Sequence, residues 1–257
     1  MASMLATSLH AAGCEIVDIC ATHYEHAAEL AHTVGASAVH RTSQLRPHAD
    51  AVVLAVPDNA IASLCLPRHS WTVIHTAGSV PLDALSAKAT NCGVMWPICS
   101  ISHHRQQHSA TAPQAQGSPL ADVPVCIEAS NSEALATLHS IISLLGASAV
   151  EISSEQRLRL HVAAVVVNNF GNALHALTQE WLAKEELSLE LLAHLARQAA
   201  ELNSDNLWQR QTGPAMRGDT ATMQHHLQLL ASTPDLQQLY SLMSNIIKTH
   251  RSPKSKA

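Results

Sequence analysis

The chain of 257 residues has no glycine before Gly13 and no lysine or arginine before Arg41. A secretory signal requires a basic segment ahead of its apolar core. The run Ala11-Ala12-Gly13-Cys14 resembles a lipoprotein cleavage region, but the missing basic residues argue against that interpretation. We therefore expect a cytoplasmic protein.

Charged residues are also scarce, at 14%, and the 15 lysines and arginines form no dense stripe. Nucleic-acid-binding proteins need such a basic surface, so we expect no nucleic-acid partner. No apolar run approaches the roughly 18 residues that cross a bilayer, and no membrane association is expected. The six cysteines include no C-x-x-C pair, which is typical of reduced thiols.

Motifs of other enzyme classes are missing as well. The chain has no G-x-S-x-G, P-loop or H-E-x-x-H, so nothing indicates a hydrolase or a kinase. Among 18 histidines, His103, His104 and His108 have a spacing that suggests a metal site. They lie in the low-complexity stretch 102–121, without acidic neighbours or a rigid scaffold, so we predict that the chain holds no metal.

Up to about residue 152, short apolar runs alternate with helical stretches, the pattern of a parallel sheet flanked by helices. The predicted helices are residues 2–12, 24–34, 59–65, 82–89 and 133–145. Gly13, Gly35 and Gly146 are expected to end helices, and Asp58 and Ser132 to cap them. The predicted strands are residues 15–20, 36–39, 51–56, 72–75, 94–96, 125–129 and 150–152.

From residue 153 onward the strand pattern disappears and long amphipathic helices follow. The predicted fold class is therefore α/β and then all-α: an incomplete Rossmann-like parallel sheet with flanking helices in residues 1–152, and an all-helical domain in residues 153–257. The sheet is incomplete because a dinucleotide-binding unit begins with a strand and a glycine-rich turn before its first helix. We expect this strand to be encoded upstream of the first codon; the alternative is a truncated or divergent copy.

A long helix that starts near Arg157 carries one polar and one apolar stripe at 100° per residue. Because the polar stripe is rich in amides and imidazoles, it suits either a wall that binds a ligand or a helix–helix interface. The polar stripe comprises Arg157, His161, Asn168, Asn172, His175 and Gln179. The apolar stripe, expected to face a core, comprises Ala163, Val166, Phe170, Leu174, Leu177 and Trp181.

The turn that contains Thr212-Gly213-Pro214 and Arg217-Gly218-Asp219 separates two helices. Asp219 is predicted to cap the second helix. Arg217 is not needed for capping, and its planar guanidinium suits a phosphate or carboxylate of a ligand. An ion pair with Asp219 or Asp205 is the alternative.

Several segments together resemble one protein family across nearly the whole chain. They are ADAVVLAVPDNAI, VIHTAGSVPLDAL, VPVCIEAS, SSEQRLRLHVAAV, NNF and TGPAMRGD. In this order they are similar to bacterial proteins that join a Rossmann-like domain to domain of unknown function 2520, which are distantly similar to pyrroline-5-carboxylate reductase and 6-phosphogluconate dehydrogenase. The resemblance implies a predicted oxidoreductase with an NAD(P)-binding domain and a helical domain that often dimerises. The chain departs from the family at Trp96-Pro97-Ile98-Cys99, where a glutamine amide and an aromatic ring are missing.

The resemblance places His161 and Asn169 at matching family positions and implies that they are catalytic, with His161 as general acid or base. From the polar stripe and the turn, we predict that Asn168, Asn172 and Arg217 bind substrate. Residues that follow the predicted strands would bind the cofactor, since parallel sheets bind ligands there; these are Thr22, His23, Val56, Pro57, Asp58, Thr76, Gly78 and Pro97. We expect NADP, or NAD, because no acidic residue follows the second strand of the family pattern. The predicted function is oxidation or reduction of a small anionic metabolite by a homodimer; the alternative is a non-catalytic ligand-binding or scaffolding protein.

Overall fold

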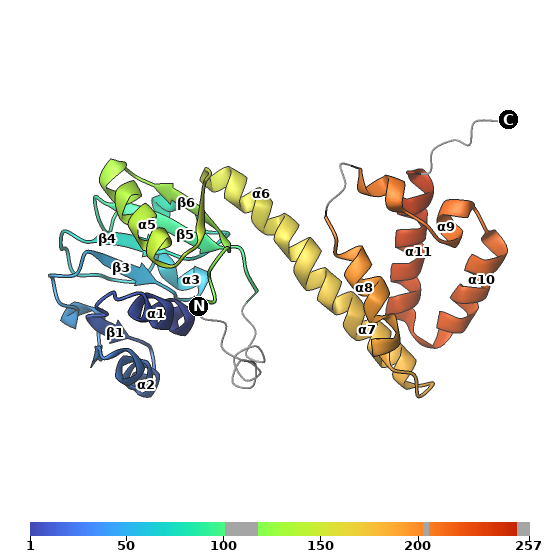
Figure 1. Cartoon of the computed structure of the whole chain (residues 1–257), viewed down its shortest axis with the longest axis horizontal. Coiled ribbons are helices and arrows are strands. Elements are labelled where there is room, and N and C mark those ends of the chain that lie inside the picture. The colour runs from blue at the N-terminus through green and yellow to red at the C-terminus, as the bar shows by residue number, and fades with distance from the viewer. Residues whose placement is uncertain (101–117, 203–205, 251–257) are drawn as a thin grey trace. The chain divides into compact units, whose positions relative to one another are not determined.

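A computed structural model describes residues 1–100, 118–202 and 206–250 of the chain. The protein consists of two compact units, Met1–Asn168 and Asn169–Ala257 (Figure 1). The first unit holds every strand of the described residues, and the second is helical. The predicted fold class, a Rossmann-like sheet followed by a helical region, is confirmed.

The strands of the first unit form two separate sheets. One holds only β1 (Asp18–Cys20) and β2 (Ser37–Val39), paired in parallel. The other has the order β3-β4-β5-β6-β7, with strands Ala51–Leu54, Thr72–His75, Cys92–Pro97, Pro124–Ala129 and Ser148–Glu151. Its pairs are parallel except β5–β6, which is antiparallel with Met95 opposite Ile127. The antiparallel pair differs from the all-parallel sheet expected from the sequence.

Helices α1 (Ala2–Ala11) and α5 (Ser132–Leu144) cover one face of the larger sheet. Leu5 and Leu9 of α1 and Leu138 of α5 pack with Ile74 and Met95 in one buried core. On the opposite face, Val73 packs with Ile61 and Leu85, which belong to α3 (Asp58–Ile61) and the 3₁₀ turn η2 (Leu82–Leu85). Neighbouring residues of β4 thus face opposite layers, as the pleat of a strand requires.

Helix boundaries follow local chemistry, with two caps displaced by one residue from the prediction. Helix α2 (Tyr24–Val34) ends at Gly35, which adopts φ 67° and thereby takes the left-handed conformation that glycine allows. Asn131, not Ser132, caps α5, because its side chain accepts the Ala134 N–H at 2.9 Å. Pro57, not Asp58, precedes α3, and the Asp58 carboxylate is used elsewhere.

Helix α6 (Ser154–Ala164) continues through a π-helical segment (Val165–Phe170) into α7 (Gly171–Ala183). Hydrogen bonds in a π-helix span five residues, so the segment shifts the register that 100° per residue would give. The side chains of the predicted apolar stripe therefore do not form a core within one copy of the chain. Val166, Phe170 and Leu174 are 51%, 60% and 44% exposed, and α7 has no buried residue.

The second unit continues with short and long helices around α11 (Pro234–Thr249). They are η4 (Leu189–Leu192), α8 (Ala193–Ala199), η5 (Leu207–Arg210), α9 (Pro214–Arg217), α10 (Thr220–Leu229) and η6 (Leu230–Ser232). Asp219 caps α10 as predicted, accepting the Thr222 N–H at 3.1 Å. In the described part of the chain, no helix is both long and apolar enough to cross a membrane.

The two compact units divide after Asn168, whereas the boundary predicted at residue 152 marks the change from strands to helices. Helix α6 therefore packs with the sheet although it follows the last strand. A buried side chain of this helix, described below, explains why.

Candidate functional site

Loops that follow β3 and β4 meet at one edge of the larger sheet. The Ser79 hydroxyl, after β4, donates a hydrogen bond to the carboxylate of Asp58, after β3. Pro57 and Asp58 are exposed, whereas Thr76, Gly78 and Pro97 are buried. The structure thus brings together the predicted residues from the ends of three strands, at the edge where parallel sheets bind ligands.

Gly78 lies directly against two side chains from other elements. A Cβ placed on Gly78 would lie 2.5 Å from His161 Cδ2 and 2.8 Å from Trp96 Cε2. The rings of Trp96 and His161 are tilted against each other, with centroids 5.5 Å apart. The close contact explains why glycine occupies this position, and it places the predicted catalytic imidazole beside the sheet edge.

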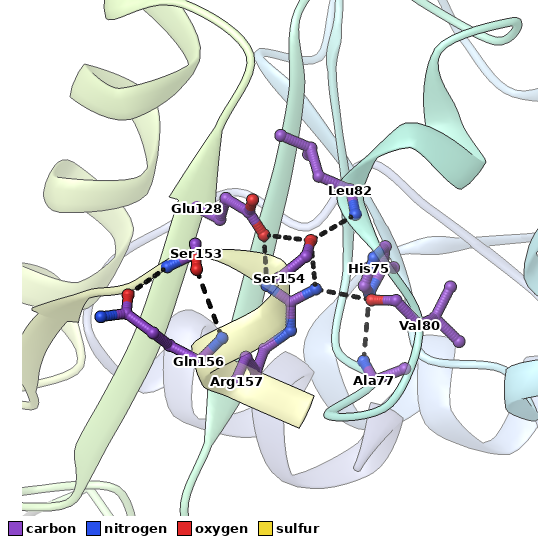
Figure 2. Close-up of polar contacts among 9 residues, drawn as sticks. All are labelled: His75, Ala77, Val80, Leu82, Glu128, Ser153, Ser154, Gln156 and Arg157. Atoms are coloured by element: carbon purple, nitrogen blue, oxygen red, sulfur yellow. Dashed lines mark hydrogen bonds and ion pairs between the residues drawn. The ribbon is translucent and has the colours of Figure 1, made fainter. Parts of the chain in front are cut away.

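A buried ion pair holds α6 on this edge (Figure 2). Arg157, which is 1% exposed, donates through Nη1 to Glu128 Oε2 on β6 at 2.5 Å. Its Nη2 donates to the Val80 carbonyl at 2.6 Å and to Ser154 Oγ at 3.2 Å. Because residues i and i+4 share one face of a helix, Arg157 also directs His161 toward the sheet.

Ser153 and Ser154 complete the anchor at the beginning of α6. Ser153 and Gln156 form a reciprocal capping box, with hydrogen bonds of 3.2 and 2.9 Å. Ser154 donates to Glu128 at 2.6 Å and accepts the Leu82 N–H at 3.0 Å. The sequence analysis placed Arg157 only in a polar stripe and did not identify Glu128 as a site residue. The carboxylate of Glu128 within the otherwise apolar strand VPVCIEAS could have indicated a buried ionic partner.

His75 lies beneath the anchor and is fully buried. Its Nδ1 accepts the Ala77 N–H at 3.2 Å, while Nε2 is buried with no hydrogen-bond partner (Figure 2). Burial, and then the positive charge of Arg157, lower the pKa of His75 to about 4. The neighbouring Pro81 backbone and the carboxylates of Asp58 and Glu128 oppose this shift without reversing it. His75 is therefore neutral at physiological pH.

A second group of polar residues follows the strands of the smaller sheet. Thr22 and His23, both exposed, come after β1, and His40 and Arg41 come after β2. The His40 ring stacks on Tyr24, with centroids 3.9 Å apart and planes at 11°. Thr22, Arg41 and Val56 line one cavity of about 1140 Å³. Arg41 was missed by the sequence analysis, although it is the second residue after a predicted strand.

The remaining predicted site residues lie on helices beyond α6. Asn168 is exposed at the end of the first unit, and Asn169, Asn172 and Arg217 are exposed in the second. The π-helical segment removes the single line on which the polar stripe was predicted, so Asn168 and Asn172 do not continue the row of Arg157 and His161.

Arg217 makes no ion pair with Asp219 in the described structure. The pKa of Asp219 is lowered mainly by hydrogen bonds from Thr222, with a smaller contribution from the charge of Arg217. Within the described ranges, no group of three or more histidine, cysteine, aspartate or glutamate side chains could hold a metal ion. His103, His104 and His108 lie outside the described residues.

Comparisons with known proteins give a consistent result. Residues 1–73 match the family "NADP oxidoreductase coenzyme F420-dependent", and residues 123–247 match domain of unknown function 2520. No curated protein matches the sequence. A predicted NADP oxidoreductase from Bacteroides fragilis is 30% identical and superposes with a TM-score of 0.81, over 96% of this chain and 94% of that one.

Two more distant structures share the fold. A reductive aminase from Aspergillus terreus, solved in complex with NADPH and ethyl levulinate, has a TM-score of 0.68 at 15% identity, over 98% of this chain and 91% of that one. A pyrroline-5-carboxylate reductase from Coxiella burnetii has a TM-score of 0.51 at 18% identity, over 98% and 95%.

The pKa of His75 predicts a loss of stability in acid. Because the group titrates at about 4 when folded and near 6.5 as a free side chain, the unfolded chain binds more protons between these values. Lowering the pH from 6.5 to 4 should therefore reduce the free energy of unfolding, by up to about 3 kcal/mol from this group. Urea unfolding at several pH values measures the slope of the free energy of unfolding against pH. His75→Leu should flatten it, while His139→Gln, at an exposed histidine, should not; equal slopes for both variants would contradict the assignment.

Gly78→Ala should displace His161 and Trp96, because the new methyl group would overlap both rings. We expect a destabilisation of about 1–3 kcal/mol by thermal unfolding and a changed NMR signal of the His161 imidazole. Gly171→Ala is the matched control, since a Cβ there meets no atom within 4 Å. A Gly78→Ala protein as stable as this control, with an unchanged His161 signal, would refute the packing.

Proposed function

Because the chain belongs to the family that joins a Rossmann-like NADP oxidoreductase domain to domain of unknown function 2520, we propose that it is an NADP-dependent oxidoreductase that acts on a small anionic metabolite. One observation carries the proposal. Gly78 and Trp96 lie against His161 of α6 at one edge of the sheet, and Asp58 accepts a hydrogen bond from Ser79, which follows Gly78.

A cavity that suits part of a nicotinamide dinucleotide adjoins this edge. It reaches from Ala2, in the first turn of α1, to Thr22 and Val56, and Val56 leads to Pro57 and Asp58, which are not part of its wall. Helix α1 has no side-chain cap at its N-terminal end, where backbone N–H groups favour phosphate. When bound, the cofactor supplies a hydride. Val56, Pro57, Asp58, Thr76, Gly78 and Pro97 would position the nicotinamide end, and Thr22 and His23 the adenosine end.

His161 is the residue that would carry the proton which accompanies hydride transfer. Its imidazole is half-buried against Trp96, and the Arg157 anchor keeps it beside Gly78. An imidazole can donate or accept a proton near neutral pH, which suits a general acid or base. Arg157 is a positioning residue in this scheme, because its guanidinium is occupied by Glu128 and Val80.

Arg41 would distinguish NADP from NAD. Arg41 lines the same cavity as Thr22, which follows the second strand of the family pattern, and its planar guanidinium suits the 2′-phosphate. For the substrate, Asn168, Asn172 and Arg217 remain the proposed binding residues and Asn169 the second catalytic one. Arg217 is exposed and suits a carboxylate or phosphate.

The proposal includes a homodimer in the cytoplasm. Large apolar side chains are exposed along the helices, with Phe170, Leu191 and Leu195 at 60%, 75% and 61%. A second copy of the chain is the partner that we propose for this surface, since exposed apolar patches mark interfaces. All six cysteines occur as free thiols, which supports a reducing compartment.

Calorimetric titration with NADPH and NADH tests the cofactor proposal. We expect NADPH to bind more tightly, and Arg41→Ala to weaken NADPH binding about 10- to 100-fold with little effect on NADH, because a charge-assisted contact to phosphate is lost. Arg159→Ala, an exposed arginine on α6, is the control. His161→Ala should retain NADPH binding and lose turnover. A chain that binds neither nucleotide would favour a non-catalytic binding or scaffolding protein.

Sedimentation velocity tests the oligomeric state. The chain should sediment as a dimer, and Phe170→Glu should shift it to a monomer by placing a charge in an apolar interface. Val150→Glu, at a 40% exposed valine of β7, is the control and should leave the dimer intact. A monomeric parent chain at micromolar concentration would eliminate this part of the proposal.

A further inference from the structure

The segment between β4 and the 3₁₀ turn η2 passes His161 without a backbone ladder of its own. Residues 76–80 all lie within the described range 1–100, and none of them makes a backbone–backbone hydrogen bond. Thr76 and Ala77 are nevertheless 8% and 7% exposed. Because buried main chain is nearly always hydrogen-bonded, side chains must determine the conformation of this segment. We call residues 76–80 the β4 loop.

Side chains hold the β4 loop at both ends. At its beginning, His75 Nδ1 accepts the Ala77 N–H at 3.2 Å (Figure 2). At its end, the Val80 carbonyl accepts from Arg157 Nη2 at 2.6 Å. The first contact ties the loop to β4, and the second ties it to α6. Gly78 lies between the two contacts, so both of them determine its position.

The position of Gly78 decides where the His161 ring can lie. A Cβ on Gly78 would be 2.5 Å from His161 Cδ2, so the glycine backbone and the imidazole are already in close contact. Trp96 also lies against this ring, with centroids 5.5 Å apart. Since packed groups leave little free space, a displaced Gly78 would either press on the imidazole or release it.

The imidazole of His75 is costly where it lies. Because Nδ1 is an acceptor, the neutral ring carries its proton on Nε2, and this buried N–H has no acceptor. The preceding residues of β4, Val73 and Ile74, are apolar. An apolar side chain at position 75 would avoid the cost of an unpaired donor, so burial alone does not account for a histidine. The acceptor that it offers to Ala77 does.

We propose that His75 is a positioning residue of the sheet edge: its Nδ1 fixes the β4 loop through Ala77, and the loop fixes the His161 imidazole through Gly78. The inference rests on the proposed function only for the role of His161 as acid or base. His75 is fully buried, so it acts through the loop and not on a ligand. A side chain with an acceptor at the place of Nδ1 should therefore substitute for it, and a side chain of the same shape without an acceptor should not.

Asparagine and leucine at position 75 test the proposal. Asparagine can place an oxygen where His75 has Nδ1, whereas leucine places a methyl group there, and both remove the rest of the ring. Hydrogen exchange followed by mass spectrometry measures the Ala77 amide. NMR with isotope-labelled histidine follows the His161 imidazole, whose signal is assigned by its loss in His161→Gln. His139→Gln, at an exposed histidine of α5, is the control and should change neither measurement.

His75→Leu should exchange the Ala77 amide about 3- to 10-fold faster than the parent chain, because one hydrogen bond is lost, and should shift the His161 signal. His75→Asn should keep both near the parent values, although its buried amide N–H groups should make it the less stable variant in thermal unfolding. Stability and the position of His161 then change in opposite directions, which a merely structural role of His75 would not produce. If His75→Leu does not fold, His75→Met replaces it, since methionine adapts to irregular space and also lacks the acceptor.

Two results would overturn the proposal. One is an Ala77 amide and a His161 signal that His75→Leu leaves as in the parent chain. The other is a His161 signal that leucine and asparagine displace equally, because the acceptor would then have no effect. Calorimetry of the parent chain with NADPH separates this outcome from the proposed function. A chain that binds no NADPH, but whose His161 is displaced by leucine and not by asparagine, loses the oxidoreductase and keeps the positioning by His75.

Discussion

The ion pair between Arg157 and Glu128 is the interaction on which the candidate site depends. Removing two charges from water is costly, and the cost is offset only where every partner is in place. Here the guanidinium reaches a carboxylate of β6, a carbonyl after β4 and a hydroxyl of its own helix. All of these partners are within reach of Arg157 in only one arrangement of α6 on the sheet. The ion pair therefore determines where α6 lies more than it adds to the stability of the fold.

Two consequences follow from burying a positive charge at this place. His75 stays neutral mainly because its ring is buried, and the positive charge of Arg157 lowers its pKa further. His161, one turn beyond Arg157, is held against Gly78 and Trp96 instead of moving freely in solvent. The sheet edge is thus formed by the rings of Trp96 and His161, backbone and the Asp58 carboxylate, an environment in which a nicotinamide and a small substrate would face few competing charges.

Local signals in the sequence predicted much of the fold. Residues 24–34 form a helix as predicted, because their amphipathic pattern ends at a glycine that can adopt positive φ. Capping was predicted less well: Asn131 and Ser132 are both good caps, and only the entry angle of the chain selects one. The antiparallel direction of β6 was not predictable, since alternation of apolar residues carries no information on strand direction.

The sequence by itself determined the succession of strands and helices, the change to helices after residue 152, and the residues that follow each strand. These depend on neighbours within a few positions, where periodicity and turn chemistry act. Only the tertiary structure decided that Arg157 meets Glu128, that Gly78 meets His161, and that the apolar side chains of α7 stay exposed. Such contacts join segments that are tens of residues apart, and they depend on sheet order and on a π-helical shift of register, for which no local pattern in the sequence is specific.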